Sequence, residues 1–95
     1  MRKNEIAAMK RRVKTLQRQI GQLGPVMRGS VVWLGARNKQ PYFSLNKEKK
    51  TRLIYLGKQR EPAARALSAN YQTLLAIVEE MTLLNMELLK QNEWD

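Results

Sequence analysis

The residue types that usually perform catalysis are scarce in this chain. Cysteine and histidine are both absent, which removes thiolate nucleophiles, imidazole bases and nearly every kind of zinc site. Of the eight acidic residues, six fall within residues 61–95. Glu79 and Glu80 are adjacent on a predicted helix, so their carboxylates point in different directions and do not form an acid–base pair. We therefore expect no enzymatic activity, no metal and no cofactor.

Basic residues are abundant and unevenly distributed. The 18 Lys and Arg residues outnumber the acidic ones and give a formal net charge of +10. Residues 1–23 hold a net +6, residues 24–60 a net +8 and residues 61–95 a net −4. Such a one-sided positive field attracts polyanions. It predicts nucleic acid as the partner. The alternative, a solvated basic face without a specific partner, stays open.

The candidate phosphate contacts form two groups. One group lies in the basic N-terminal segment and consists of Lys10, Arg11, Arg12, Lys14 and Arg18. The other lies around the predicted turns of a sheet and consists of Arg37, Lys39, Lys47, Lys49, Lys50 and Arg52. In one geometry the sheet enters the major groove, which admits a narrow sheet, and its group meets phosphates and bases. In the other the N-terminal helix lies along the phosphate backbone through its own group, and the sheet is purely structural.

The basic N-terminal segment, residues 1–24, is predicted to be a helix. From Asn4 to Leu23 its apolar residues are spaced 3, 4, 3, 4 and 3 apart, which is the heptad pattern of a coiled-coil seam. Asn4 is the expected N-cap. Gly24 and Pro25 are expected to end the helix.

Residues 28–57 are predicted to form a three-stranded antiparallel meander. The expected strands, residues 30–34, 42–45 and 51–56, are rich in β-branched and aromatic residues. Phe43 and Leu45 are expected in the core. Tyr42 and Tyr55 are candidates for the exposed side.

Residues 61–92 are predicted to form one long helix with Pro62 in its first turn. About thirty helical residues span roughly 45 Å, more than a three-stranded sheet needs as cover. The fold class is therefore α+β, with the two helices paired either as a hairpin within the chain or as a coiled coil between subunits. The predicted oligomer or partner interface follows one heptad stripe: Leu74, Val78, Met81, Asn85 and Leu88. A homo-oligomer is expected.

The length of 95 residues indicates a single domain. No run of 18 apolar residues is present, and the N-terminus lacks the apolar core of a signal peptide. We therefore expect a cytoplasmic protein that does not enter a membrane.

Four short motifs resemble one protein family: LGPVMRGSVV at 23–32, PYFSL at 41–45, TRLIYL at 51–56 and LNMELLK at 84–90. The chain is similar to small proteins of bacterial and archaeal mobile elements, often encoded beside transposases. Members commonly carry cysteines between the first two strands, where this chain has GARNKQ at 35–40, so no metal is carried over. The resemblance implies an association with mobile-element or phage DNA, so DNA is the expected polymer rather than RNA.

Two functions are compatible with these observations. The first is a small basic nucleic-acid-binding accessory protein of a mobile element or phage; a three-stranded sheet followed by a helix also resembles the arm-binding domains of phage-type integrases. The second is an adaptor or inhibitor subunit that docks a larger nuclease or transposase through its long apolar helix.

Overall fold

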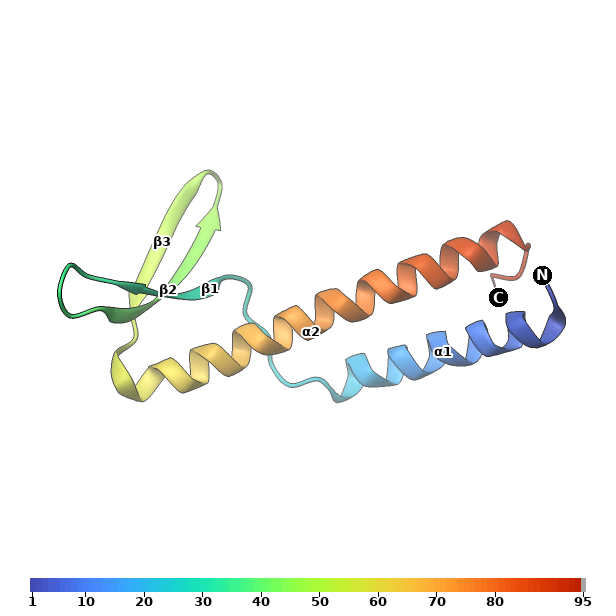
Figure 1. The fold of residues 1–95 in the computed structure, drawn as a ribbon, viewed down its shortest axis with the longest axis horizontal. Helices are drawn as coiled ribbons and strands as arrows, with labels where there is room; N and C mark the ends of the chain where they lie inside the picture. The colour runs from blue at the N-terminus through green and yellow to red at the C-terminus, as the bar shows by residue number, and fades with distance from the viewer. Residues whose placement is uncertain (95) are drawn as a thin grey trace. The chain divides into compact units, whose positions relative to one another are not determined.

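The computed structural model describes residues 1–94 and has the predicted α+β architecture (Figure 1). Its elements, in chain order, are α1 (Lys3–Gln22), β1 (Ser30–Leu34), β2 (Gln40–Lys47), β3 (Lys50–Tyr55) and α2 (Gly57–Lys90). The chain forms two compact units. We call Met1–Leu23 together with residues 73–94 the hairpin unit, and residues 24–72 the sheet unit. The expectation of a single domain stays a prediction.

In the hairpin unit, α1 and the second half of α2 pair as antiparallel helices (Figure 1). Leu16 of α1 and Ile77 and Leu88 of α2 are buried. The helices therefore pair within the chain, which was one of the two predicted arrangements. Leu16 is the buried residue of α1, and the other apolar residues of its predicted seam are half-buried in this pairing.

The helix α1 begins before the predicted cap. Arg2 occupies the N-cap position with an extended backbone and no side-chain capping bond, and its carbonyl accepts from the N–H groups of Glu5 and Ile6. Asn4 lies inside the helix, so its prediction as the cap was wrong. At the other end, Leu23 is the C-cap, directly before Gly24 and Pro25 as predicted.

In the sheet unit, the strands follow the order β1-β2-β3 and both pairs are antiparallel. The register places Val31, Phe43 and Ile54 side by side, and Val32, Tyr42 and Tyr55 side by side. Because side chains alternate along a strand, these two rows lie on opposite faces. We call the face with Phe43 the covered face. The other is the open face, formed by Ser30, Val32, Leu34, Gln40, Tyr42, Ser44, Asn46, Thr51, Leu53 and Tyr55.

The covered face packs against the first turns of α2. Phe43, Leu56 and Ala64 are buried together, and Met27, Val31 and Leu45 pack against them. The predicted core positions of Phe43 and Leu45 are therefore confirmed.

The segment that leads into β1 is bonded to α2 at three points. Met27 N–H donates to the Leu67 carbonyl at 3.1 Å, Asn70 Nδ2 donates to the Pro25 carbonyl at 2.9 Å, and Ser68 Oγ donates to the Gly29 carbonyl at 3.0 Å. These bonds fix the entry of β1 and hence the position of the sheet on the helix.

The helix α2 begins four residues earlier than predicted. Gly57 adopts a left-handed φ of +66° directly after the buried Leu56, so the chain passes from β3 into the helix without a loop. Pro62 consequently lies inside the helix and not at its first turn. Pro62 has no N–H group to donate to the Lys58 carbonyl, so the helix lacks this bond near its start. The helix ends at Lys90, two residues before the predicted end.

Candidate nucleic-acid interface

The positive charge of the chain is concentrated in the sheet unit. Its 49 residues, 24–72, contain ten Lys and Arg and two acidic residues, a net +8. Residues 1–23 and 73–95 contain eight basic and six acidic residues, a net +2. Most of the +10 therefore lies in about half of the chain.

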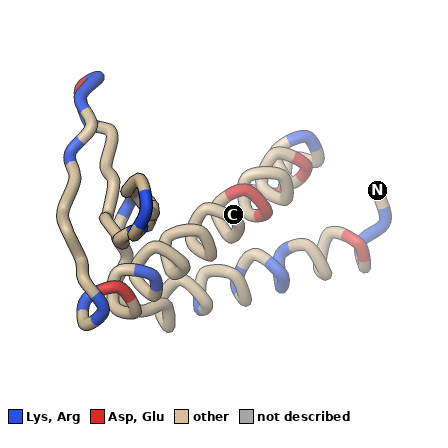
Figure 2. The backbone as a smooth tube through the Cα atoms, turned by 60° about the vertical axis from the view of Figure 1, so that its left-hand side comes forward, with Lys and Arg blue, Asp and Glu red and all other residues tan. Residues whose placement is uncertain are grey.

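Within the sheet unit, basic side chains gather at the two turns. Arg37 and Lys39 lie in the exposed connection between β1 and β2. Lys47, Lys49 and Lys50 lie at the turn between β2 and β3, where Figure 2 shows the basic residues at the tip of the hairpin. These two turns lie at opposite ends of β2. We call them the basic tips.

The β2–β3 tip is formed at a cost in stability. Glu48 and Lys49 both have left-handed backbones, with φ of 54° and 65°, although neither is Gly or Asn. The register also pairs Lys47 with Lys50, and like charges at paired positions destabilise a sheet. Because strain of this kind gathers at functional sites, it marks the tip as a candidate for binding.

Few of these charges are neutralised inside the chain. Among the described residues, the sheet unit contains one ion pair, between Arg65 and Glu61. Arg52 is exposed, opposite Leu45 in the register. Arg28, which the sequence analysis did not select, donates from Nη1 to the Asn46 carbonyl at 2.9 Å beside the β2–β3 tip. Arg28 lies in a segment without helical or strand periodicity, so the sequence did not predict that its side chain would contact β2.

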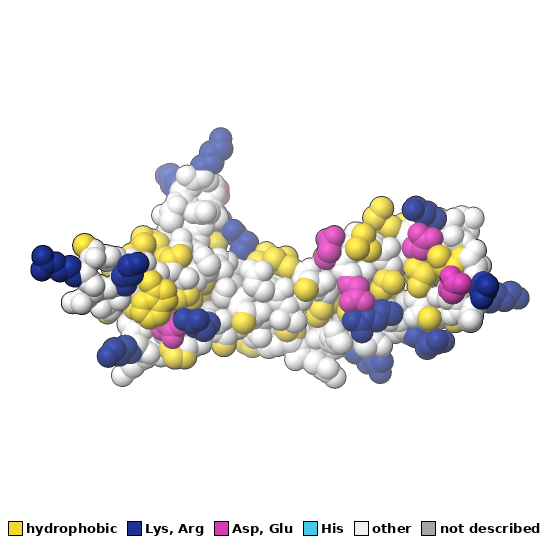
Figure 3. Space-filling model, in the orientation of Figure 1, with side chains coloured by type: hydrophobic (Ala, Val, Ile, Leu, Met, Phe, Trp, Pro, Cys, Tyr) yellow, Lys and Arg dark blue, Asp and Glu magenta, His cyan; other side chains and the backbone are white. Residues whose placement is uncertain are grey.

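The open face between the tips is uncharged and partly aromatic. The rings of Tyr42 and Tyr55 meet edge to face, with centroids 5.5 Å apart. Tyr55 is 47% exposed and Leu53 is 49% exposed. In Figure 3, hydrophobic side chains gather on the sheet at the left, and dark blue side chains extend beyond them at its ends.

The helix group of predicted contacts is divided by the structure. Arg12 binds Glu80 through two bonds, of 2.6 and 2.9 Å, and Lys10 binds Glu93 at 2.9 Å. The Arg12 hydrogen bonds hold the pKa of Glu80 below its usual value, and those bonds raise the pKa of Arg12. These two cations are therefore paired with carboxylates of the same unit.

The other basic residues of that group are exposed. Arg11 and Lys14 lie on the surface of α1, and Arg18 donates from Nη2 to Thr15 Oγ1 at 3.3 Å. Three exposed cations on one helix remain able to meet phosphates.

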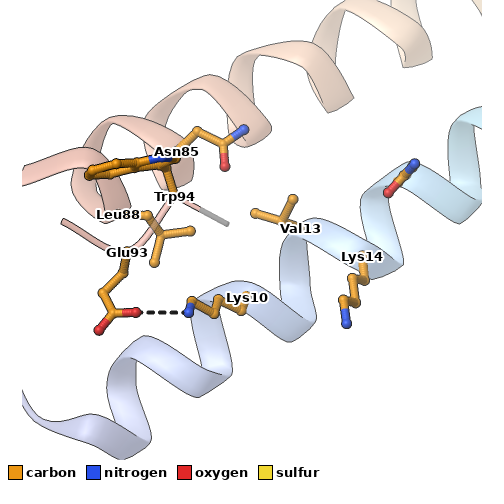
Figure 4. Close-up of a pocket in the computed structure, with 8 residues that line it drawn as sticks. Lys10, Val13, Lys14, Asn85, Leu88, Glu93 and Trp94 are labelled. Atoms are coloured by element: carbon orange, nitrogen blue, oxygen red, sulfur yellow. Dashed lines mark hydrogen bonds and ion pairs between the residues drawn. The ribbon is translucent and has the colours of Figure 1, made fainter. Parts of the chain in front are cut away.

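A cleft of about 290 Å³ lies in the hairpin unit near the end of α2 (Figure 4). Val13, Leu88 and Trp94 line it together with Lys10, whose ammonium group reaches Glu93. Over residues 1–94, no group of three or more acidic side chains is placed to hold a metal ion. The cleft thus combines apolar side chains with the ion pair between Lys10 and Glu93.

The predicted interface residues of α2 fall on two sides of the helix. Leu88 is buried and Leu74 and Met81 are partly buried, whereas Val78 and Asn85 are exposed. Ile77 and Leu84, not chosen for the seam, take their places on the buried side. The buried side also recurs at heptad spacing, so the predicted stripe shares Leu74, Met81 and Leu88 with it and is displaced by one residue at positions 78 and 85.

Neither helix, over residues 1–94, combines the length and the apolar character needed to cross a bilayer. The cytoplasmic location stays a prediction.

Comparison of the chain with protein-family models, with curated proteins and with solved structures found no match. The resemblance to proteins of mobile elements therefore stays a prediction as well.

Proposed function

We propose that this protein binds nucleic acid through the sheet unit, as an accessory protein of a mobile element or phage, with DNA preferred to RNA. The observation that supports it most directly is the net +8 of residues 24–72. Phosphates dominate nucleic-acid affinity, and a contact with them needs exposed cations that are not already neutralised. The basic tips provide such cations.

The sheet is a stronger candidate than α1 because of internal competition for charge. Arg12 and Lys10 are held by Glu80 and Glu93, so a phosphate would have to displace a carboxylate. The lysines at the β2–β3 tip have no such competitor within residues 1–94, since the neighbouring Glu48 forms no ion pair there. A phosphate at this tip would also relieve the repulsion between Lys47 and Lys50.

Charge reversal tests the location of the contact. The variant Lys47→Glu/Lys49→Glu/Lys50→Glu should bind labelled DNA at least about tenfold more weakly in fluorescence anisotropy, because it replaces three phosphate contacts with repulsions. The log–log dependence of affinity on salt should become shallower by about 0.9 for each lost contact with duplex DNA, or about 0.7 with a single strand.

The matched control reverses three exposed cations of α1. The variant Arg11→Glu/Lys14→Glu/Arg18→Glu makes the same change in net charge, and it should reduce affinity less than the tip variant. If the α1 variant loses binding and the tip variant keeps it, α1 is the contact and the sheet assignment fails. If the unaltered protein binds no nucleic acid at low salt, the function itself is rejected.

A specific observation favours a second candidate function, an adaptor that docks a larger nuclease or transposase. Leu75, Val78, Met86 and Leu89 of α2 are 43–55% exposed and recur at helical spacing. We call them the apolar stripe. Contiguous exposed apolar surface is a feature of protein interfaces. This candidate predicts that Val78→Glu impairs partner binding but leaves DNA binding unchanged.

A further inference from the structure

We propose that the open face binds single-stranded nucleic acid, with unstacked bases resting on Tyr42 and Tyr55 and the phosphates held at the basic tips. This inference rests on the proposed function and names its ligand class. The alternative ligand for a narrow sheet is the major groove of a duplex. The two ligands require different side chains on the face that meets them.

The open face has the chemistry that bases stack on. Tyr42 and Tyr55 are paired in the register of β2 and β3, with Val32 on the other side of Tyr42. Leu34 and Leu53 extend the apolar surface and are exposed. Aromatic side chains on a sheet stack with splayed bases of any sequence, because every base has a π-face.

The same face is poorly suited to read base edges in a duplex. Groove contacts rely on Arg, Lys, Asn and Gln side chains, and the open face contains neither Arg nor Lys. The acceptor oxygens of its two amide side chains are already engaged, since Gln40 Oε1 accepts from the Tyr55 hydroxyl at 3.3 Å and Asn46 Oδ1 accepts from the Thr51 hydroxyl at 2.7 Å. In a duplex, moreover, the flat faces of the bases are covered by their neighbours.

Charge and length complete the match. The basic tips lie at opposite ends of β2, whose eight residues span roughly 25 Å. This distance suits about four nucleotides, near the lower limit for single-strand-binding folds. A neutral aromatic surface between two cationic ends can hold the bases in the middle and the backbone at both ends.

The test compares a labelled oligo(dT) with a blunt duplex of the same length, at one low salt concentration, by fluorescence anisotropy. The unaltered protein should bind the single strand about tenfold more tightly than the duplex. Tyr55→Val, which keeps a strand-forming side chain, should lower affinity for the single strand about tenfold. Tyr55→Phe should retain it, because the ring and not the hydroxyl supports the base.

The matched control is Trp33→Val, which removes an aromatic residue of similar exposure, 49%, from the opposite side of β1. It should leave single-strand affinity unchanged, and thermal melts should show that each variant is folded.

Equal or tighter binding of the duplex overturns the inference, as does an unchanged affinity of both Tyr55→Val and Tyr42→Val for the single strand. If either of these results is obtained but the variant Lys47→Glu/Lys49→Glu/Lys50→Glu still loses binding, the proposed function stands and only the inference about the single strand is rejected. Failure to bind either polymer rejects both.

Discussion

A single glycine controls how β1 meets β2. Gly29 has a φ of +127°, a conformation that L side chains rarely adopt. A Cβ at this position would lie 2.6 Å from the Phe43 ring and 2.6 Å from the Ser44 carbonyl oxygen. Ser68 also bonds the Gly29 carbonyl, so the backbone cannot move away without losing that bond.

Gly29→Ala should therefore lower the free energy of unfolding of the sheet unit by about 2 kcal/mol or more, because it combines backbone strain with a clash in the core. Gly21→Ala is the matched control. A Cβ at Gly21 in α1 meets nothing within 4 Å, so this change should raise stability by up to about 1 kcal/mol. Urea denaturation followed by circular dichroism measures both. Equal effects of the two changes would contradict the assigned role of Gly29.

The chemistry of the candidate site was partly predictable at the level of single residues. Lys and Arg at the turns were selected because charge and turn position are both visible in the sequence. The engagement of Arg12 by Glu80 was not predictable, since the two lie 68 residues apart and only the pairing of the helices brings them together. The same holds for Lys10 and Glu93.

At the scale of elements, the ion pair between Arg12 and Glu80 links the stability of the hairpin unit to pH. The lowered pKa of Glu80 means that its charged form is bound more favourably in the folded state, through the Arg12 hydrogen bonds. The stabilisation is therefore fully present above the usual Glu pKa of about 4.3 and disappears as pH falls through the lower folded value.

Glu80→Gln should accordingly make the protein less stable than the unaltered chain at neutral pH, and the difference should vanish in acid. Thermal melts from pH 7 to about pH 3 give the comparison. Glu79→Gln serves as control, because Glu79 is exposed and forms no ion pair among the described residues. A Glu80→Gln deficit that persists unchanged at the lowest pH would exclude the ion pair as its cause.

Element type and order followed from the sequence because periodicity and strand propensity agree along most of the chain. The boundaries were less accurate where neighbours override propensity. Gln40, Pro41, Asn46 and Lys47 are poor strand formers, yet pairing with β1 and β3 draws them into β2. The start of α2 was misplaced because Pro62 suggested a first turn, whereas the left-handed Gly57 allows the helix to begin directly after Leu56.

At the scale of the whole molecule, the expected homo-oligomer can be tested on the apolar stripe. α1 covers one side of α2, and the stripe lies on another side without a partner among residues 1–94. Light scattering should give a mass above that of a monomer, and Val78→Glu/Leu89→Glu should return it to the monomer by placing charges in an apolar contact. Ala76→Glu, exposed but outside the stripe, should not. A monomeric unaltered protein contradicts the expectation.

The uneven charge of the molecule was visible in the sequence, but its division between two units was not. The count along the sequence assigned residues 61–95, with their net charge of −4, to the long C-terminal helix alone. The structure divides that segment, because α2 contributes residues 57–72 to the sheet unit and 73–90 to the hairpin unit. The acidic residues Glu79, Glu80, Glu87 and Glu93 thus share a unit with the basic α1 and offset its charge.

The division into two units gives each its own optical reporter. The chain has two tryptophans, Trp33 in the sheet unit and Trp94 in the hairpin unit, and both are exposed. Replacing one with phenylalanine leaves emission from a single unit, so the melting of each can be followed separately. Coincident transitions in the two single-tryptophan proteins would show that the chain unfolds as one cooperative body, whereas separated transitions would reveal a stable intermediate in which one unit remains folded.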